Sequence, residues 1–180
     1  MRAILLVLLL GVLPAVESHG RQIPDAAQVG NVSVPLRGAD MLVWKWLVDL
    51  YVAALYLPPG VSGVEAAVAA TPKRLRMEYA RDFTKTNMVE ATDETIGRNV
   101  TPEQRMALQA SLTTWNALYP APKKGDVVTF DHLPGGDLIM SLNGTELGRI
   151  QDDAFARALF AIWIGANPVK TSLRDTLIGK

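Results

Sequence analysis

The strand-like segments of this chain fall into two groups, with helix-like segments between and after them. Six segments alternate or are dense in β-branched and aromatic residues, namely residues 32–36, 41–57, 73–83, 126–133, 137–142 and 145–150. The regular strand–helix–strand alternation that builds a parallel sheet is missing. The order therefore predicts an α+β protein, in which a curved antiparallel sheet carries its helices packed on one face.

Turn residues divide these strands. Asn143-Gly144 is the dipeptide most typical of a two-residue hairpin, and it predicts the turn between residues 137–142 and 145–150. Pro134-Gly135-Gly136 predicts the turn between residues 126–133 and 137–142. By the same reasoning, Gly38-Ala39-Asp40 is expected to be a turn. Residues 41–57 are then one long buried strand, or two strands joined by a bend.

The helical segments have clearer patterns. Residues 64–70 predict a short helix and residues 86–99 a polar surface helix. A capping box over residues 101–104 opens a helix that ends before Pro120 and carries one apolar stripe, made by Leu108, Leu112, Trp115 and Tyr119. Residues 153–164 are strongly amphipathic, and a last short helix is expected from Asn167-Pro168 to Gly179.

The amino terminus has the pattern of a secretory signal peptide. A basic Met1-Arg2 start precedes an apolar run over residues 3–13, and Val16 and Ser18 are small residues at the positions a signal peptidase reads. We therefore expect residues 1–18 to be a signal peptide and residues 19–180 to form one domain; the alternative is an uncleaved membrane anchor. An exported protein without cysteine fits a bacterial periplasm best, and no transmembrane segment is expected in the mature chain.

Composition excludes several classes of function. The 18 basic and 18 acidic residues cancel, which argues against a nucleic-acid partner. Without cysteine, disulfides, thiolate metal sites and cysteine nucleophiles are impossible, and no cofactor is expected. A hydrolase triad would have to use His132, which we expect instead on a hairpin surface. Cleavage after Ser18 would make His19 the first residue, and a terminal-amine copper site is a minor alternative.

Arg81 is the most informative charged residue. In an extended strand it would share one face with Leu75, Met77, Tyr79 and Phe83, which are all apolar or aromatic. A cation in such surroundings needs an anion, because an unpaired buried charge costs several kcal/mol. Either it forms a structural salt bridge, with Asp49 or Glu90 as candidates, or it binds a ligand's carboxylate in a cleft. Tyr51 could add a hydroxyl donor there.

Taken in order, several segments resemble the chalcone isomerase-like superfamily, in its bacterial exported branch. The resemblance spans residues 30–180. It rests on residues 50–57, on residues 72–75 running into Arg81-Asp82-Phe83, on residues 124–126 followed by the Asn143-Gly144 hairpin, on Phe155 with residues 163–168, and on Leu173 with residues 177–179.

This resemblance implies an open-faced β-sandwich with a cleft between the sheet and the helices. The superfamily contains plant enzymes that close a chalcone to a flavanone, plastid fatty-acid-binding proteins and members without known catalysis. Both the enzymes and the binders have an arginine soon after a Gly-Ala pair. Here Gly38-Ala39 is followed by residues 40–43, Asp-Met-Leu-Val, so that arginine is missing and the nearest cations are Arg37 and Lys45.

The remaining family positions separate the binders from the enzymes. Tyr51 matches the tyrosine of the fatty-acid binders, where the enzymes have threonine. The catalytic tyrosine and asparagine of the helix after the central strand are replaced by Met88 and Thr95. The catalytic set is therefore largely absent.

The resemblance favours an exported, non-catalytic protein that binds a small hydrophobic or amphipathic ligand such as a fatty acid. The expected ligand-binding residues are Arg81, Tyr51, Lys45, Met88 and Thr95. Two alternatives stay open: an intramolecular lyase (isomerase) that uses Arg81 or Lys45 with Tyr51, and an envelope interaction module without a ligand. The oligomeric state is left open.

Overall fold

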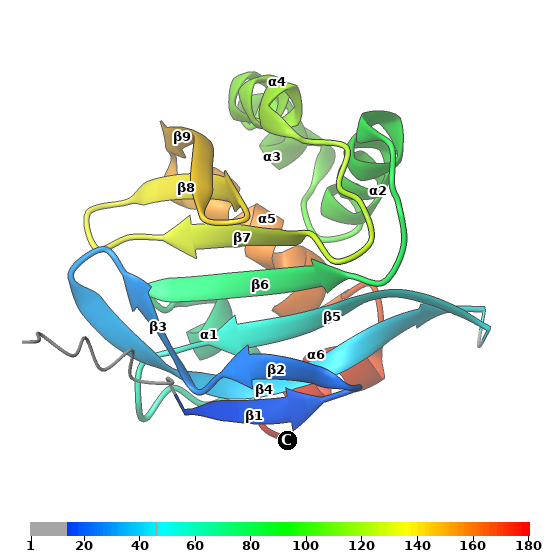
Figure 1. Cartoon of the computed structure of the whole chain (residues 1–180). Coiled ribbons are helices and arrows are strands. Elements are labelled where there is room, and N and C mark those ends of the chain that lie inside the picture. The colour runs from blue at the N-terminus through cyan, green and yellow to red at the C-terminus, as the bar shows by residue number, and fades with distance from the viewer. Residues whose placement is uncertain (1–13, 46) are drawn as a thin grey trace, which may run out of the picture.

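A computed structural model describes residues 14–45 and 47–180 and contains a seven-stranded antiparallel sheet (Figure 1). Its strands follow one another in sequence order: β3 (Ala26–Val29), β4 (Val32–Trp44), β5 (Val48–Tyr56), β6 (Lys73–Tyr79), β7 (Val127–His132), β8 (Asp137–Leu142) and β9 (Thr145–Gln151). A separate two-stranded hairpin precedes them, made by β1 (Ala15–Ser18) and β2 (Arg21–Pro24). The predicted antiparallel α+β architecture is confirmed.

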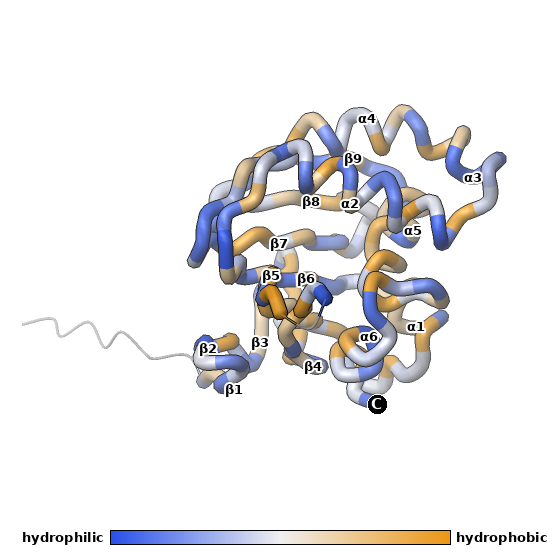
Figure 2. Tube along the Cα trace, turned by 90° about the vertical axis from the view of Figure 1, so that its right-hand side faces the viewer, coloured by the Kyte–Doolittle hydropathy of each residue, from blue (hydrophilic) through white to orange (hydrophobic). Residues whose placement is uncertain are grey.

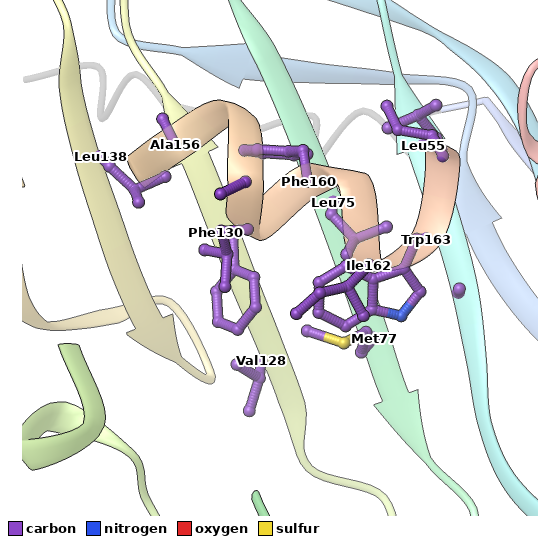
Figure 3. Close-up of a cluster of buried hydrophobic side chains, with 14 of the residues drawn as sticks. Leu55, Leu75, Met77, Val128, Phe130, Leu138, Ala156, Phe160, Ile162 and Trp163 are labelled. Carbon is purple, nitrogen blue, oxygen red and sulfur yellow. The ribbon is translucent and has the colours of Figure 1, made fainter. Parts of the chain in front are cut away.

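Among the described residues, six helices accompany the sheet: α1 (Val64–Ala69), α2 (Lys85–Gly97), α3 (Pro102–Ala107), α4 (Gln109–Leu118), α5 (Asp153–Ile164) and α6 (Thr171–Leu177). The central helix is α5, in which nine of the twelve residues are buried. Its apolar residues pack on the face of the sheet that presents Leu75, Met77 and Phe130 (Figure 3). This interface forms the main core. No helix of the described chain is long and apolar enough to cross a membrane.

The opposite face of the sheet has a smaller core. Along β5, Val52, Ala54 and Tyr56 point to this second face while their neighbours point to the first, so the strand is buried on both sides. The hairpin of β1 and β2 lies on this side, away from α1 and α6 (Figure 2). The Tyr56 hydroxyl donates to the carbonyl of Pro24 at 2.9 Å, and Ile23 is fully buried.

The predicted turn at residues 38–40 is wrong. These residues continue β4, with bulges at Leu36/Gly38 and Leu42/Val43, and they pair with β5. Gly38 is needed for a different reason, because α6 crosses β4 there. A Cβ atom at residue 38 would lie 2.0 Å from the carbonyl oxygen of Thr176. Residues 41–57 are two strands joined by a turn, which was one of the two expected arrangements.

One further strand ends earlier than predicted, and one predicted helix is divided in two. Strand β6 ends at Tyr79, and after Ala80 donates to the carbonyl of Leu50 the chain leaves the sheet towards α2. The helix opened by the predicted capping box at Thr101 is divided at Leu108 into α3 and α4. Its apolar stripe is nonetheless continuous and buried, as expected.

Candidate functional site

A cavity of about 400 Å³ lies between the inner face of the sheet and the helices α2 and α5. Eleven of its lining residues are apolar: Leu42, Trp44, Leu50, Met77, Phe83, Met88, Ala91, Phe130, Ile162, Trp163 and Val169. Eight carry polar groups: Tyr51, Tyr79, Asn87, Thr92, Glu94, Thr95, Arg98 and Tyr119. Figure 3 shows Met77, Phe130, Ile162 and Trp163 where α5 meets β6 and β7. A concave apolar site with a few polar groups is typical of a small-molecule pocket.

Two tyrosines are placed side by side in this cavity by strand register. Tyr51 on β5 pairs directly with Tyr79 on β6, so both side chains project from the same face of the sheet. Their ring centroids are 5.5 Å apart. Trp163 of α5 donates from its indole nitrogen to the Tyr51 hydroxyl oxygen over 2.8 Å. The two phenols are thus fixed between the sheet and α5.

Both hydroxyls keep a hydrogen that no oxygen or nitrogen of the described residues accepts. Tyr51 accepts a bond from Trp163, and within residues 14–45 and 47–180 it donates to no group. The Tyr79 hydroxyl donates only to the sulfur of Met88, at 3.5 Å, and a thioether is a weak acceptor. Buried polar groups normally find good partners, so these two donors are available to a ligand.

A third phenol is satisfied inside the protein. The hydroxyls of Tyr119 and Thr92 share a hydrogen bond of 2.6 Å at the back of the cavity. Burial raises the pKa of Tyr119 to about 12, although the bond with Thr92 acts in the opposite direction. Burial also raises the pKa of Tyr51 and of Tyr79 well above the usual phenol value. All three stay neutral near pH 7, so they can donate hydrogen bonds but cannot act as phenolate bases.

Helix α2 supplies the charged groups of the lining. Glu94 and Arg98 are one helical turn apart and form an ion pair, and both side chains are substantially exposed. A cation and an anion therefore stand where the cavity opens to solvent. Sequence reasoning missed Arg98, because a polar helix was expected to be surface only.

The structure brings three of the five predicted ligand residues to this cavity. Tyr51, Met88 and Thr95 line it. The Thr95 hydroxyl is occupied, because it donates to the carbonyl of Ala91 at 2.8 Å. Met88 contacts the Tyr79 hydroxyl through its sulfur.

The two predicted cations lie outside the cavity. Lys45 is exposed and places its ammonium group 4.3 Å from the ring centre of Trp44, beside a neighbouring hollow. Arg81 is exposed in the loop after β6, so it does not share the apolar face of that strand. It makes no ion pair with Asp49, Glu90 or any other part of the chain that the structure describes. Of the two alternatives for Arg81, the structural salt bridge is therefore wrong, and Arg81 does not line the cavity either.

The residues after Gly38-Ala39 explain why the part of the cavity lining that β4 supplies is apolar. Leu42 lines the cavity, while Met41 points into the second core on the other face of the sheet. Asp40 bonds His19 over 2.8 Å. Residues 40–43 therefore supply no cation in place of the arginine that the family resemblance predicts there.

The expectation for His132 is wrong as well. It is buried at the end of β7, with its Nδ1 atom 3.3 Å from the ammonium nitrogen of Lys73 and its Nε2 atom 3.0 Å from Asp153. Across the described ranges, His, Asp and Glu side chains nowhere form a group of three or more that could hold a metal ion.

Comparisons with known proteins identify the fold and the family of this chain. The fold is similar to the crystal structure of a fatty-acid binding protein of Arabidopsis thaliana, with a TM-score of 0.66 and 12% sequence identity. The match covers 89% of this chain and 92% of that chain. A search of curated proteins finds no match. A family model described as chalcone isomerase-like matches residues 15–179, so the chain belongs to the chalcone isomerase-like family.

Proposed function

We propose that this protein binds a fatty acid, or a closely similar amphipathic molecule, in the cavity between the sheet and α2. The observation that carries the proposal is the pair of buried hydroxyls of Tyr51 and Tyr79, which have hydrogens to donate and no strong acceptor. They stand in a cavity whose lining is mostly apolar and whose size is typical for small ligands.

The chemistry of the lining suggests how such a ligand would lie. A carboxylate oxygen accepts short, charge-assisted hydrogen bonds from neutral hydroxyls, and two phenols can hold one carboxyl group. The alkyl chain would then contact Leu50, Met77 and Met88. The solved structure with a similar fold is that of a fatty-acid binding protein, which supports the same ligand class.

Removing the hydroxyls tests the proposal. We expect Tyr79→Phe to weaken dodecanoate binding by roughly ten- to a hundredfold, because a hydrogen bond to a charged group contributes roughly 1.5–3 kcal/mol. Tyr51→Phe should weaken it similarly, although it also leaves the Trp163 indole without its acceptor. Isothermal titration calorimetry with dodecanoate and with dodecane-1-ol separates the contribution of the carboxylate from that of the chain.

A matched control is available on the same strand. Tyr56 is also a buried tyrosine of β5, but its hydroxyl donates to Pro24 in the second core on the far face of the sheet. Tyr56→Phe should leave dodecanoate affinity unchanged. If wild type binds no fatty acid, or if all three variants bind like wild type, the proposed site is wrong.

We also propose that the protein is not an enzyme. A phenol held neutral by burial cannot accept a proton, which removes Tyr51 and Tyr79 as general bases. The wall after Gly38-Ala39 offers Leu42 rather than a cation to stabilise an oxyanion. Binding without turnover is the function that such a lining supports best.

We further propose that the domain acts after export, with cleavage following Ser18. Residues 1–13 lie outside the described residues, so the proposal rests on their sequence. The three residues Ala15, Val16 and Glu17 of β1 are exposed, so removing this strand would uncover little apolar surface, whereas Ile23 of β2 would keep its place in the core. Expression of the full chain in a bacterium should give a periplasmic protein whose measured mass is that of residues 19–180. A cytoplasmic protein of full mass would contradict this.

A further inference from the structure

We propose that the hairpin tip between β4 and β5 docks onto the surface of an anionic lipid bilayer and opens the ligand cavity towards it. We define the hairpin tip as Trp44, Lys45 and Leu47. The docking itself stands on the exposure and chemistry of these residues. Only the delivery of a ligand through the tip rests on the proposed function.

The hairpin tip exposes large apolar side chains to solvent. Leu47 is 88% exposed and Trp44 is 54% exposed. They are held together by a turn in which the amide of Leu47 donates to the carbonyl of Trp44 at 3.2 Å. The hairpin projects beyond the neighbouring strands (Figure 1). A projecting pair of this kind gains little from the folded monomer and is typical of an interaction site.

The chemistry of the hairpin tip suits a lipid surface. Tryptophan is enriched at the boundary between headgroups and acyl chains, where an amphipathic ring has both an apolar and a polar neighbour. Lys45 keeps its ammonium group beside the ring of Trp44, at 4.3 Å from its centre. A lysine in this position can extend its charge to the phosphates while its methylene groups and the indole enter the membrane.

Charge at this end of the sheet favours anionic lipid. Arg81 is exposed and has no ion-pair partner in the described chain, and it follows Ala80, whose amide donates to the carbonyl of Leu50 on β5. Lys45 of the tip and Lys170, which lines the hollow beside it, add to this charge; of the carboxylates here, Asp49 is exposed and Asp82 is paired with Lys123. Each basic residue near an anionic surface adds attraction that falls with salt.

The hairpin tip is continuous with the ligand cavity. Trp44 and Leu50 line both the cavity and the neighbouring hollow, as does Val169 from the other side. One wall of the cavity therefore leads to the exposed tip. A fatty acid leaving the bilayer along this wall would keep its alkyl chain against apolar side chains and avoid a passage through water.

Vesicle partitioning tests the docking without any added ligand. Wild type should sediment with vesicles of phosphatidylglycerol and phosphatidylcholine, and binding should fall with rising salt. The double variant Trp44→Ser/Leu47→Ser should bind at least about tenfold more weakly, because it lacks the two apolar side chains that wild type would bury in the bilayer. Lys45→Gln/Arg81→Gln should weaken binding to anionic vesicles and leave neutral vesicles unaffected.

A matched control lies elsewhere on the molecule. Met106 on α3 is 72% exposed and lines neither the cavity nor the hollow beside it, so Met106→Ser should bind vesicles like wild type. No partitioning by wild type, or equal loss in the Met106 variant, would overturn the proposal. A concentration-dependent dimer that Leu47→Ser abolishes in sedimentation velocity would also overturn it, in favour of a second copy as the occupant.

The outcome is separable from that of the proposed function. Tyr79→Phe alters the cavity and not the hairpin tip, so this variant should keep its vesicle binding. If wild type partitions onto vesicles but binds no fatty acid, the docking holds and delivery fails. If Leu47→Ser, at a position that lines neither the cavity nor the hollow, binds dodecanoate in solution like wild type but takes it up more slowly from vesicles, both hold.

Discussion

Gly38→Ala is expected to destabilise the protein by about 3 kcal/mol or more, as overpacking against backbone does. A Cβ atom at residue 38 would lie 2.0 Å from the carbonyl oxygen of Thr176 and 3.1 Å from the Cα atom of Leu177. Both atoms belong to the backbone of α6, so no side-chain rotation can relieve the overlap. Either α6 moves away from β4 or β4 bends, and each movement opens the core at the fully buried Leu177.

Urea unfolding monitored by circular dichroism measures this effect. The matched control is Gly97→Ala at the end of α2, where the nearest atom to an added Cβ is the Nη1 of Arg105, 4.0 Å away. Neither glycine has a positive φ, so the two substitutions differ in space and not in backbone strain. The control should unfold at the same urea concentration or a slightly higher one. Equal midpoints for both variants would show that α6 does not need this close approach.

Gly38 also shows why part of the fold was hidden in the sequence. A Gly-Ala-Asp triplet between two strand-like segments predicts a turn, because local rules attribute glycine to backbone freedom. Here the glycine is needed because the backbone of a helix almost 140 residues away packs against it, and no local pattern reveals that contact. Where local and tertiary demands agree, as in the Asn143-Gly144 hairpin and the helix over residues 153–164, the sequence predictions are confirmed.

The candidate site was only partly predictable for a similar reason. Tyr51 was proposed as a hydroxyl donor from its place on a hydrophobic strand and again from the family resemblance. Its partner Tyr79 depends on the register between β5 and β6, which the sequence does not display. On α2 the cavity face mixes apolar, hydroxyl and charged residues, so its helical spacing leaves no apolar stripe to notice. Arg81 was expected on the apolar face of the sheet because the predicted strand ran to residue 83, whereas β6 ends at Tyr79.

A second large effect is expected at Lys73, the most deeply buried charged residue of the described chain. Its ammonium group donates to the carbonyls of Val68 and Ala70, both at 2.7 Å, and lies 3.3 Å from Nδ1 of His132 and 4.6 Å from the ring centre of Phe160. Burial lowers the pKa of Lys73 to about 7, with Arg157 acting in the same direction and Asp153 against it. Burial, reinforced by Lys73, likewise lowers the pKa of His132.

The sign of the pH dependence follows from these shifts. Lysine in the unfolded chain has a pKa near 10.5, so between about pH 7 and pH 10.5 the unfolded state binds more protons than the folded state. The free energy of unfolding therefore rises with pH across this window, by about 3 kcal/mol between pH 7 and roughly pH 9.5. Below pH 6.5 the protonation of His132 should lower the stability further, because its folded pKa is also depressed.

Lys73→Met separates the contribution of Lys73 to the pH dependence of stability from that of every other titrating group. The methionine cannot bond the two carbonyls, which costs about 1–3 kcal/mol for each buried acceptor left unpaired, so the variant should be less stable than wild type at high pH. It should also lose most of the rise between pH 7 and roughly pH 9.5, because the lysine that releases its proton is gone. Urea unfolding at several pH values measures both quantities, with the exposed Lys124→Met as the matched control. A variant that keeps the wild-type slope would show that Lys73 stays charged throughout, held by its three acceptors, and that the slope has another origin.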